Sequence, residues 1–312
     1  MLIIASALAA IIPMVSYLIF IWKFDRYDRE PFKLVLQNYL WGSLGAIVFA
    51  VLGSLIISEI LSLFIPGEED LNYLGSIITA PVVEEITKGI FLFVTVTNKK
   101  FDNVTDGIVY GGAIGLGFGM TENFLYFISF GADISNWISI VLVRTLFSAV
   151  MHCVTTATFG AFLGYAKLKG LSHKHIISLI GLVIAILIHF AWNYSVSFKS
   201  TALPGFLFMA VTIVIFIAIY STAVVNERKI ILDELLSEVE SGIIPSSHLE
   251  HLCSASRNSR GWIDENIRKT YLIASTTLAF KKNRLKNTQG ESRKFCEDEV
   301  SNYRKFIKSL IA

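Results

Sequence analysis

Apolar residues form seven long runs in the first 225 positions, near residues 2–22, 36–65, 73–97, 104–130, 137–166, 176–198 and 203–225. A run of about 20 apolar residues is long enough to cross a bilayer as a helix. Residues 226–312 are instead rich in charged side chains, with apolar residues at the spacing of amphipathic helices. We therefore predict an all-α fold: a polytopic membrane bundle of about seven transmembrane helices (residues 1–225) and a small helical cytoplasmic extension (residues 226–312).

The basic residues alternate between successive loops. They gather after the first, third, fifth and seventh runs, at Lys23, Arg26, Arg29, Lys33, Lys99, Lys100, Lys167, Lys169, Lys174, Arg228 and Lys229. The intervening loops PGEED and GADISNW have none, and Lys199 stands alone after the sixth run. By the positive-inside rule, we predict a multi-pass protein of the cytoplasmic membrane with its N-terminus outside and its C-terminus in the cytoplasm.

The tail has no metal, nucleotide or nucleic-acid motif that we can identify. Its basic residues are mixed with acidic ones, which argues against nucleic-acid binding. We interpret it as a stabilising or partner-binding appendage.

The third, fourth, fifth and sixth apolar runs each contain ionisable side chains that we group as one polar set. An ionisable group at bilayer depth costs roughly 2.5–3.5 kcal/mol, so each of these residues needs a reason to be there. The polar set, in chain order, is Glu84, Glu85, Lys88, Glu122, Asn123, Arg144, His152, His189 and Asn193.

Structural explanations exist for individual members of this set. Glu84 and Lys88 are four residues apart and can neutralise each other, which leaves Glu85 unmatched. Arg144 can pair with Glu122 or with Glu85. Taken together, however, carboxylates from two helices and imidazoles from two others favour one shared site. A rise of 1.5 Å per residue places these groups at similar depths in the outer half of the membrane.

The motifs resemble those of the PrsW family of intramembrane proteases, which is related to CAAX-processing and bacteriocin-immunity-type membrane peptidases. The resemblance covers about residues 20–200 and rests on Glu84-Glu85-x-x-Lys88, Phe118-Gly-x-x-Glu122-Asn123, Arg144 with His152, and His189-x-x-Trp192-Asn193. It implies a glutamate pair, a second carboxylate or histidine, and a final histidine with an asparagine, in a cavity reached by water. The CAAX-type relatives have a histidine where this chain has Glu122.

Two mechanisms of peptide hydrolysis fit this set. In the metal version, Glu122, His152 and His189 bind Zn²⁺ and Glu84 or Glu85 is the general base. In the metal-free version, Glu85 activates water while His189 and Asn193 stabilise the oxyanion. Lys88 and Arg144 restrain the local charge in both, and Asn123 belongs to the second motif. The metal version is favoured because two histidines with a glutamate are a suitable zinc ligand set.

We predict an endopeptidase that cuts a membrane-anchored protein on the extracytoplasmic side, with the lipid bilayer as its environment. The resemblance implies a regulator such as an anti-sigma factor as the substrate. Two other functions stay open at this stage. One is a proton- or ion-coupled transporter that uses the three glutamates, although no repeated halves with interrupted helices are visible. The other is a silent scaffold whose polar residues join helices.

Overall fold

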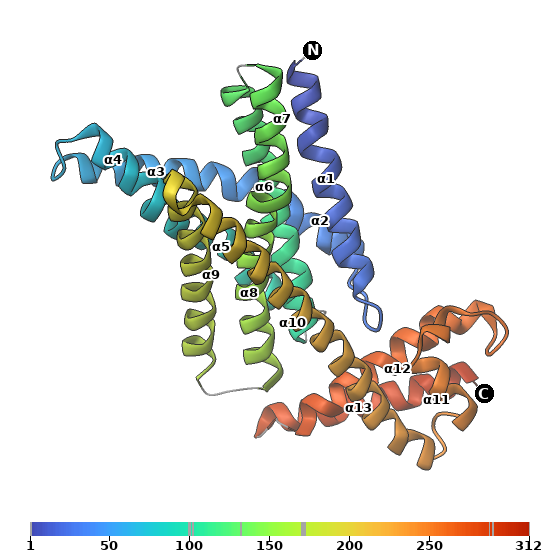
Figure 1. Ribbon diagram of the computed structural model, residues 1–312. Helices are drawn as coiled ribbons and strands as arrows, with labels where there is room; N and C mark the ends of the chain where they lie inside the picture. The colour runs from blue at the N-terminus through green and yellow to red at the C-terminus, as the bar shows by residue number, and fades with distance from the viewer. Residues whose placement is uncertain are drawn as a thin grey trace. The chain divides into compact units, whose positions relative to one another are not determined.

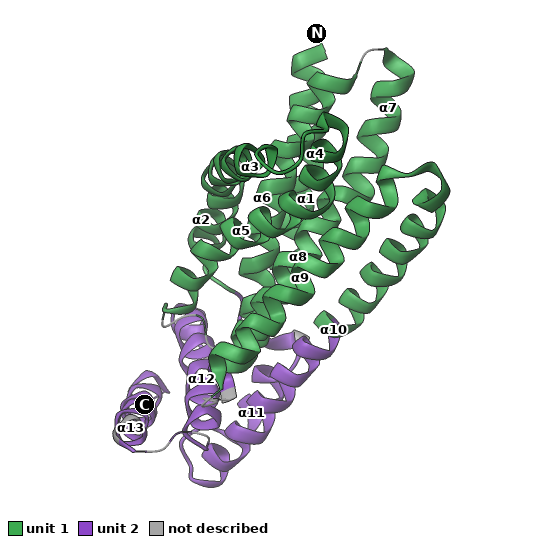
Figure 2. Ribbon diagram, turned by 90° about the vertical axis from the view of Figure 1, so that its left-hand side faces the viewer, with its two compact units in different colours: residues 1–24, 30–166, 173–220 green, residues 25–29, 167–172, 221–312 purple. Residues whose placement is uncertain are grey.

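The computed structural model describes residues 2–98, 101, 103–131, 133–169, 173–286, 288 and 290–311. Lys99 and Lys100, which entered the prediction of orientation, lie outside the described residues. Within these ranges all regular structure is helical. The chain forms two compact units: residues 1–24, 30–166 and 173–220 make up unit 1, and residues 25–29, 167–172 and 221–312 make up unit 2 (Figure 2).

Unit 1 contains ten elements that position the site (Figure 1). They are α1 (Leu2–Phe24), α2 (Phe32–Leu40), α3 (Ile47–Ser62), α4 (Glu68–Leu74), α5 (Ala80–Val96), α6 (Val104–Phe130), α7 (Ile134–Val143), α8 (Ala149–Lys169), α9 (Lys174–Ser197) and the first half of α10 (Lys199–Glu240). Three short π-helical segments join consecutive helices, namely η1 (Trp41–Ala46), η2 (Gly75–Thr79) and η3 (Arg144–Ser148). π-Helical turns are frequent at functional sites.

In the described chain, five continuous helical stretches are long and apolar enough to cross a membrane: Leu2–Phe24, Phe32–Ser62, Ile134–Leu168, Lys174–Ser197 and Lys199–Glu240. The predicted spans 73–97 and 104–130 are also helical, as α4–η2–α5 and α6, but charged groups lower the hydropathy of the first and glycines that of the second. The membrane-helix fold class is therefore confirmed, while the count of seven crossings stays a prediction. Both views show α3 at a steep angle to α6 and α8 (Figures 1 and 2).

Helix α6 lies at the centre of unit 1, and its residues from Thr105 to Gly119 are buried. A capping box fixes its start, because Asn103 accepts from the Asp106 amide at 2.9 Å and Asp106 accepts from the Asn103 amide at 3.1 Å. Three of its glycines face α8 directly. A Cβ added at Gly107, Gly111 or Gly115 would stand 2.0–2.3 Å from a backbone oxygen of α8. These glycines let the backbones of α6 and α8 approach each other closely.

Unit 2 is a small helical body with its own core. It combines the end of α10 with α11 (Ser246–Leu252), the 3₁₀ turn η4 (Ala255–Asn258), α12 (Glu265–Lys286) and α13 (Glu291–Ile311). Ile231 and Leu235 of α10 share a core with Tyr271 and Leu278 of α12 and Ile307 of α13. Helix α10 continues past residue 225 because no glycine or proline interrupts it before Gly242, which adopts a φ of +67°.

Candidate active site

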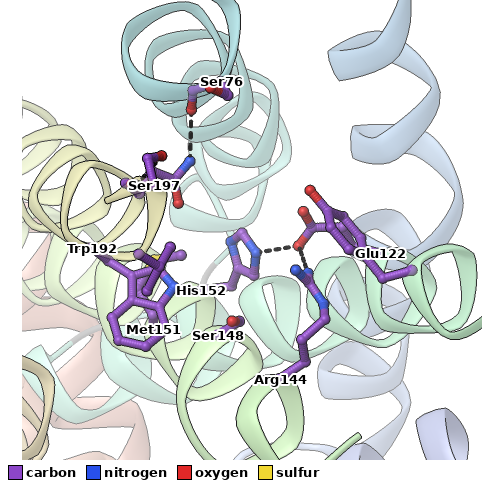
Figure 3. A pocket seen from close by; sticks show the side chains of 11 residues that line it. Ser76, Glu122, Arg144, Ser148, Met151, His152, Trp192 and Ser197 are labelled. Atoms are coloured by element: carbon purple, nitrogen blue, oxygen red, sulfur yellow. Dashed lines mark hydrogen bonds and ion pairs between the residues drawn. The ribbon is translucent and has the colours of Figure 1, made fainter. Parts of the chain in front are cut away.

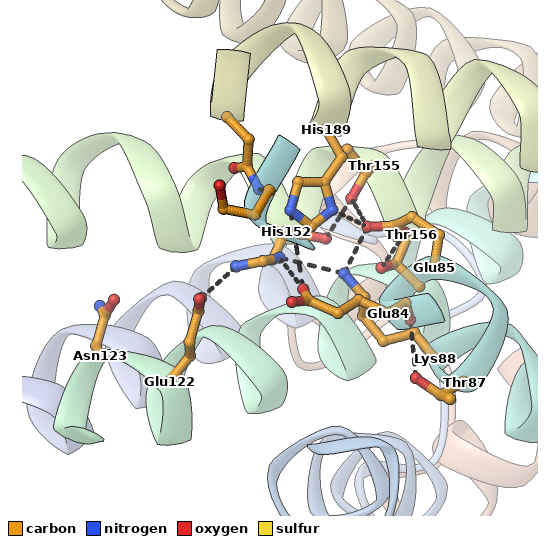
Figure 4. A network of polar contacts seen from close by, with 12 residues as sticks. Glu84, Glu85, Thr87, Lys88, Glu122, Asn123, His152, Thr155, Thr156 and His189 are labelled. Atoms are coloured by element: carbon orange, nitrogen blue, oxygen red, sulfur yellow. Dashed lines mark hydrogen bonds and ion pairs between the residues drawn. The ribbon is translucent and has the colours of Figure 1, made fainter. Parts of the chain in front are cut away.

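Helix α5 supplies the adjacent glutamates, and its packing gives them different surroundings. Glu85 is 1% exposed and accepts from the Lys88 ammonium at 2.5 Å (Figure 4). It also accepts from the hydroxyl groups of Thr155 at 3.0 Å and Thr156 at 3.4 Å on α8. His189 Nδ1 of α9 lies 2.9 Å from Glu85 Oε1. Glu85 therefore joins α5, α8 and α9 in one buried network.

Glu84 points about 100° away around the helix and has a different environment. Its Oε2 lies 3.9 Å from His152 Nδ1 and 3.8 Å from His189 Nε2. Among the described residues, this buried oxygen has no hydrogen-bond partner. Lys88 is three residues from Glu85 and pairs with it, so the expected neutralisation of Glu84 by Lys88 is wrong.

The second motif on α6 meets α8 and its π-helical start. Glu122 Oε2 lies 2.6 Å from His152 Nε2 and 2.7 Å from the Arg144 guanidinium. Arg144 also donates to Asn123 Oδ1 at 3.0 Å and covers the Tyr126 ring, with its Cζ 3.6 Å from the ring centre. The structure thus contains the Arg144–Glu122 pair among the pairings suggested by sequence.

A pocket of about 160 Å³ opens onto this cluster (Figure 3). His152 lies between Ser76 on one side and Glu122 with Arg144 on the other. The remaining lining residues are Tyr126, Ser148, Met151, Trp192, Asn193, Val196 and Ser197. The wall is mostly polar, as expected for a water-filled cavity at membrane depth.

Asn193 lines the pocket but is already engaged. Its amide nitrogen donates to the Ser76 carbonyl oxygen at 2.9 Å. That carbonyl needs a side-chain donor because Ala80 donates five residues back to Gly75, and the next residue in this register, Pro81, has no N–H. Asn193 therefore bridges α9 and η2 in this structure.

Two predicted ligands, His152 and His189, lie together with Glu84, and the ligand atoms of the three residues are all within 4.8 Å of one another. The predicted third ligand, Glu122, contacts the opposite nitrogen of His152. Sequence reasoning missed Thr155, Thr156 and Ser76. Hydroxyl groups are common in membrane helices, and only the position of Thr155 and Thr156, a turn after His152, signalled a link to the site.

The hydrogen bonds make this trio suitable for a metal ion. The Glu85 carboxylate accepts from His189 Nδ1–H and leaves the lone pair of Nε2 free. The Glu122 carboxylate accepts from His152 Nε2–H, so the lone pair of this ring is on Nδ1, which accepts from the Lys88 ammonium at 3.1 Å in this structure. These two nitrogens and the unpartnered Glu84 oxygen converge, so a metal ion bound here would take the place of Lys88 at His152 Nδ1. Two imidazoles oriented by carboxylates, with a third carboxylate as ligand, are a common catalytic zinc arrangement.

Comparisons with known proteins agree with this geometry. The model of the "PrsW family intramembrane metalloprotease" matches residues 30–220, which include every residue of the cluster. "Protease PrsW" of Oceanobacillus iheyensis is 30% identical over 229 residues, 72% of this chain and 97% of the relative. "Protease PrsW" of Bacillus subtilis is 27% identical over 210 residues, 67% of this chain and 88% of the relative.

The relative of the same name from Clostridioides difficile is 28% identical over 189 residues, 60% of this chain and 77% of its own length. No solved structure matches the chain. These relatives are named as proteases, so the transporter interpretation is not favoured.

Proposed function

Because the chain belongs to the PrsW family of intramembrane proteases and is a membrane-embedded peptidase, we propose that it cuts a membrane-anchored protein on the extracytoplasmic side by metal-assisted hydrolysis. The observation that carries the proposal is the convergence of Glu84, His152 and His189 beside a polar pocket. The expected substrate remains a membrane-anchored regulator of the anti-sigma type. The expected division into a protease core, residues 1–225, and a cytoplasmic tail, residues 226–312, is part of this proposal.

The position of the pocket along its helices supports cleavage on the extracytoplasmic side. Ser76 lies soon after the acidic loop PGEED, and Ser197 directly precedes the loop at Lys199. Both loops are extracytoplasmic in the orientation predicted from the basic residues. A substrate that enters this pocket would therefore be cut near the outer surface of the membrane.

The two glutamates of α5 have separate roles in the proposal. Glu85 is a positioning residue, because four donors occupy its oxygens and one of them, His189, is held by it. Glu84, His152 and His189 are the metal ligands, with Zn²⁺ as the candidate ion. A bound divalent ion would polarise the scissile carbonyl and activate a water molecule.

Glu122 is the proposed general base and acid, since it lines the pocket and is oriented by Arg144, which in turn donates to Asn123. It takes the proton of the attacking water as the C–O bond forms. It then passes that proton to the leaving amine as the C–N bond breaks. Lys88 supplies a positive charge beside Glu85, next to the ligands.

Metal analysis combined with a cleavage assay tests these roles. The purified full-length protein and three variants, Glu84→Gln, Glu122→Gln and His189→Ala, are each incubated with a membrane-anchored reporter protein. We expect Glu84→Gln and His189→Ala to lose both metal and cleavage. Glu122→Gln should keep the metal while cleavage falls by about 10²–10⁴-fold, the usual contribution of a general base.

The control is Glu59→Gln, which removes an exposed carboxylate of α3 and should change neither readout. If the wild-type protein cleaves the reporter without any bound metal, the metal-free glutamate mechanism replaces this one. If Glu84→Gln cleaves at the wild-type rate, the proposed site is wrong.

A further inference from the structure

The pocket walls differ in how firmly they are held. On one side, α6 and α8 meet through glycines so closely that a Cβ at Gly107 would stand 2.0 Å from the Gly160 oxygen. On another, α9 is anchored to its neighbours by Trp192, which shares a core with Met151 and Val154 of α8 and Met209 of α10. Neither wall can move without breaking a packed interface.

The remaining side of the pocket is lined by Ser76. This residue ends the segment 68–76, formed by α4 and the start of η2, which we call the flap. None of the described residues of α4 is buried. A Cβ added at Gly75 would meet nothing within 4 Å. Burial begins only at Ile77 and Thr79, at the base of the flap.

Two contacts close the flap against α9. One is the Asn193–Ser76 hydrogen bond of 2.9 Å at the pocket (Figure 3). The other is the stack of Tyr73 on Phe198, with ring centres 5.6 Å apart and planes 5° from parallel. One neutral hydrogen bond and one aromatic pair are each weak contacts, so thermal motion can break both and open the flap.

The base of the flap contains two features at which helices commonly bend. Residues Gly75–Thr79 are π-helical, and Pro81 removes the N–H that would continue the helical bonding to Ser76. Kinks in helices concentrate at π-helical turns and prolines. Movement here leaves Glu84, one turn after Pro81, on the packed part of α5.

We propose that the flap, residues 68–76, is the entry for the substrate and that Asn193 couples its opening to catalysis. In the closed flap, the Asn193 amide is bound to Ser76. Opening breaks that bond and releases an N–H donor inside the pocket, beside His152, where it can face the carbonyl oxygen of the scissile bond. This mechanism rests on the proposed proteolysis. It adds the path by which the substrate enters and the step that releases the Asn193 donor.

Cross-linking the flap to α9 tests the route. Tyr73→Cys and Phe198→Cys are introduced together in the full-length protein and joined by a short or a long, flexible bismaleimide. The three native cysteines are buried, and single-cysteine variants measure any background reaction. The control pair is Trp41→Cys with Phe91→Cys, which replaces another stacked pair, with ring centres 5.3 Å apart, on η1 and α5.

We expect the short link to lower cleavage of the membrane-anchored reporter by more than about tenfold, because gating motions can limit turnover. The long link should restore it, and bound metal should be the same in all samples. The control pair should stay active with either link. Full cleavage with the short link in place would overturn the proposal while leaving the proposed proteolysis intact.

Backbone hydrogen exchange gives a second test that needs no cleavage. In the wild-type protein, amides 68–76 should exchange faster than those of α6 and α9. Asn193→Ala should speed exchange in the flap and yet slow cleavage, a combination that a simple structural defect at a remote site would not produce. A flap that exchanges as slowly as α6, or that ignores Asn193→Ala, would overturn the proposal.

Discussion

Replacing Gly115 by alanine should separate two catalytic helices by a predictable amount. The new Cβ on α6 would stand 2.1 Å from the His152 carbonyl oxygen on α8, and real Cβ atoms do not approach closer than 3.0 Å. This oxygen belongs to the backbone, so no side chain can rotate away. The helices must therefore move apart by about 0.9 Å at this level.

This movement acts on the bond between Glu122 and His152, which join the same two helices. Their contact is 2.6 Å, and adding the displacement brings it to about 3.5 Å, the outer limit of a hydrogen bond. A misplacement of about 1 Å can cost about 10²-fold in rate. We expect Gly115→Ala to lower cleavage by about that factor.

Gly112→Ala is the matched control on the same helix. Its Cβ would meet the Cys153 sulfur at 3.3 Å and Ile21 Cδ1 at 3.5 Å, and both are side-chain atoms with room to adjust. Cleavage of the membrane-anchored reporter, thermal unfolding and bound metal are measured for both variants. A folded Gly115→Ala protein with wild-type cleavage would refute the claim that this seam sets the site geometry.

Two further predictions concern smaller contacts. Thr155→Val removes a donor to Glu85 and should lower metal affinity by about 10–100-fold by competition with a chelator, whereas Thr158→Val, which loses only a bond to its own helix, should not. In the tail, burial and the neighbouring His251 lower the pKa of His248 below its usual 6.5. The folded state therefore takes up its proton less readily, so unfolding measurements should show the tail losing stability as pH falls below about 6.5, and His248→Gln should flatten this dependence.

The sequence allowed the helical membrane class, the family and the members of the polar set to be predicted. Apolar runs and costly ionisable residues carry that information directly. The sequence did not show which of the two glutamates, Glu84 or Glu85, pairs with Lys88. Spacing favours both an i,i+3 and an i,i+4 partner for Lys88, and the choice of Glu85 depends on which face of α5 meets α8 and α9.

The flap also could not be predicted from the sequence. A π-helical turn has no reliable residue pattern, and Pro81, inside the apolar run 73–97, is equally compatible with the first turn of a helix. The donor that compensates for it, Asn193, is 117 positions from Ser76. Such a contact follows only from the arrangement of α9 against η2.

The buried Glu85 network has a consequence for biosynthesis. Its acceptor on α5 and its donor on α9, His189, are 104 residues apart in the chain. At about 5–20 residues per second, a ribosome needs roughly 5–20 seconds to make the second after the first. During that interval α5 has Lys88 to offset the charge of Glu85 but lacks the hydrogen-bond donors of α8 and α9, so it has to stay sheltered from lipid, at the insertion machinery or against earlier helices, until those helices emerge.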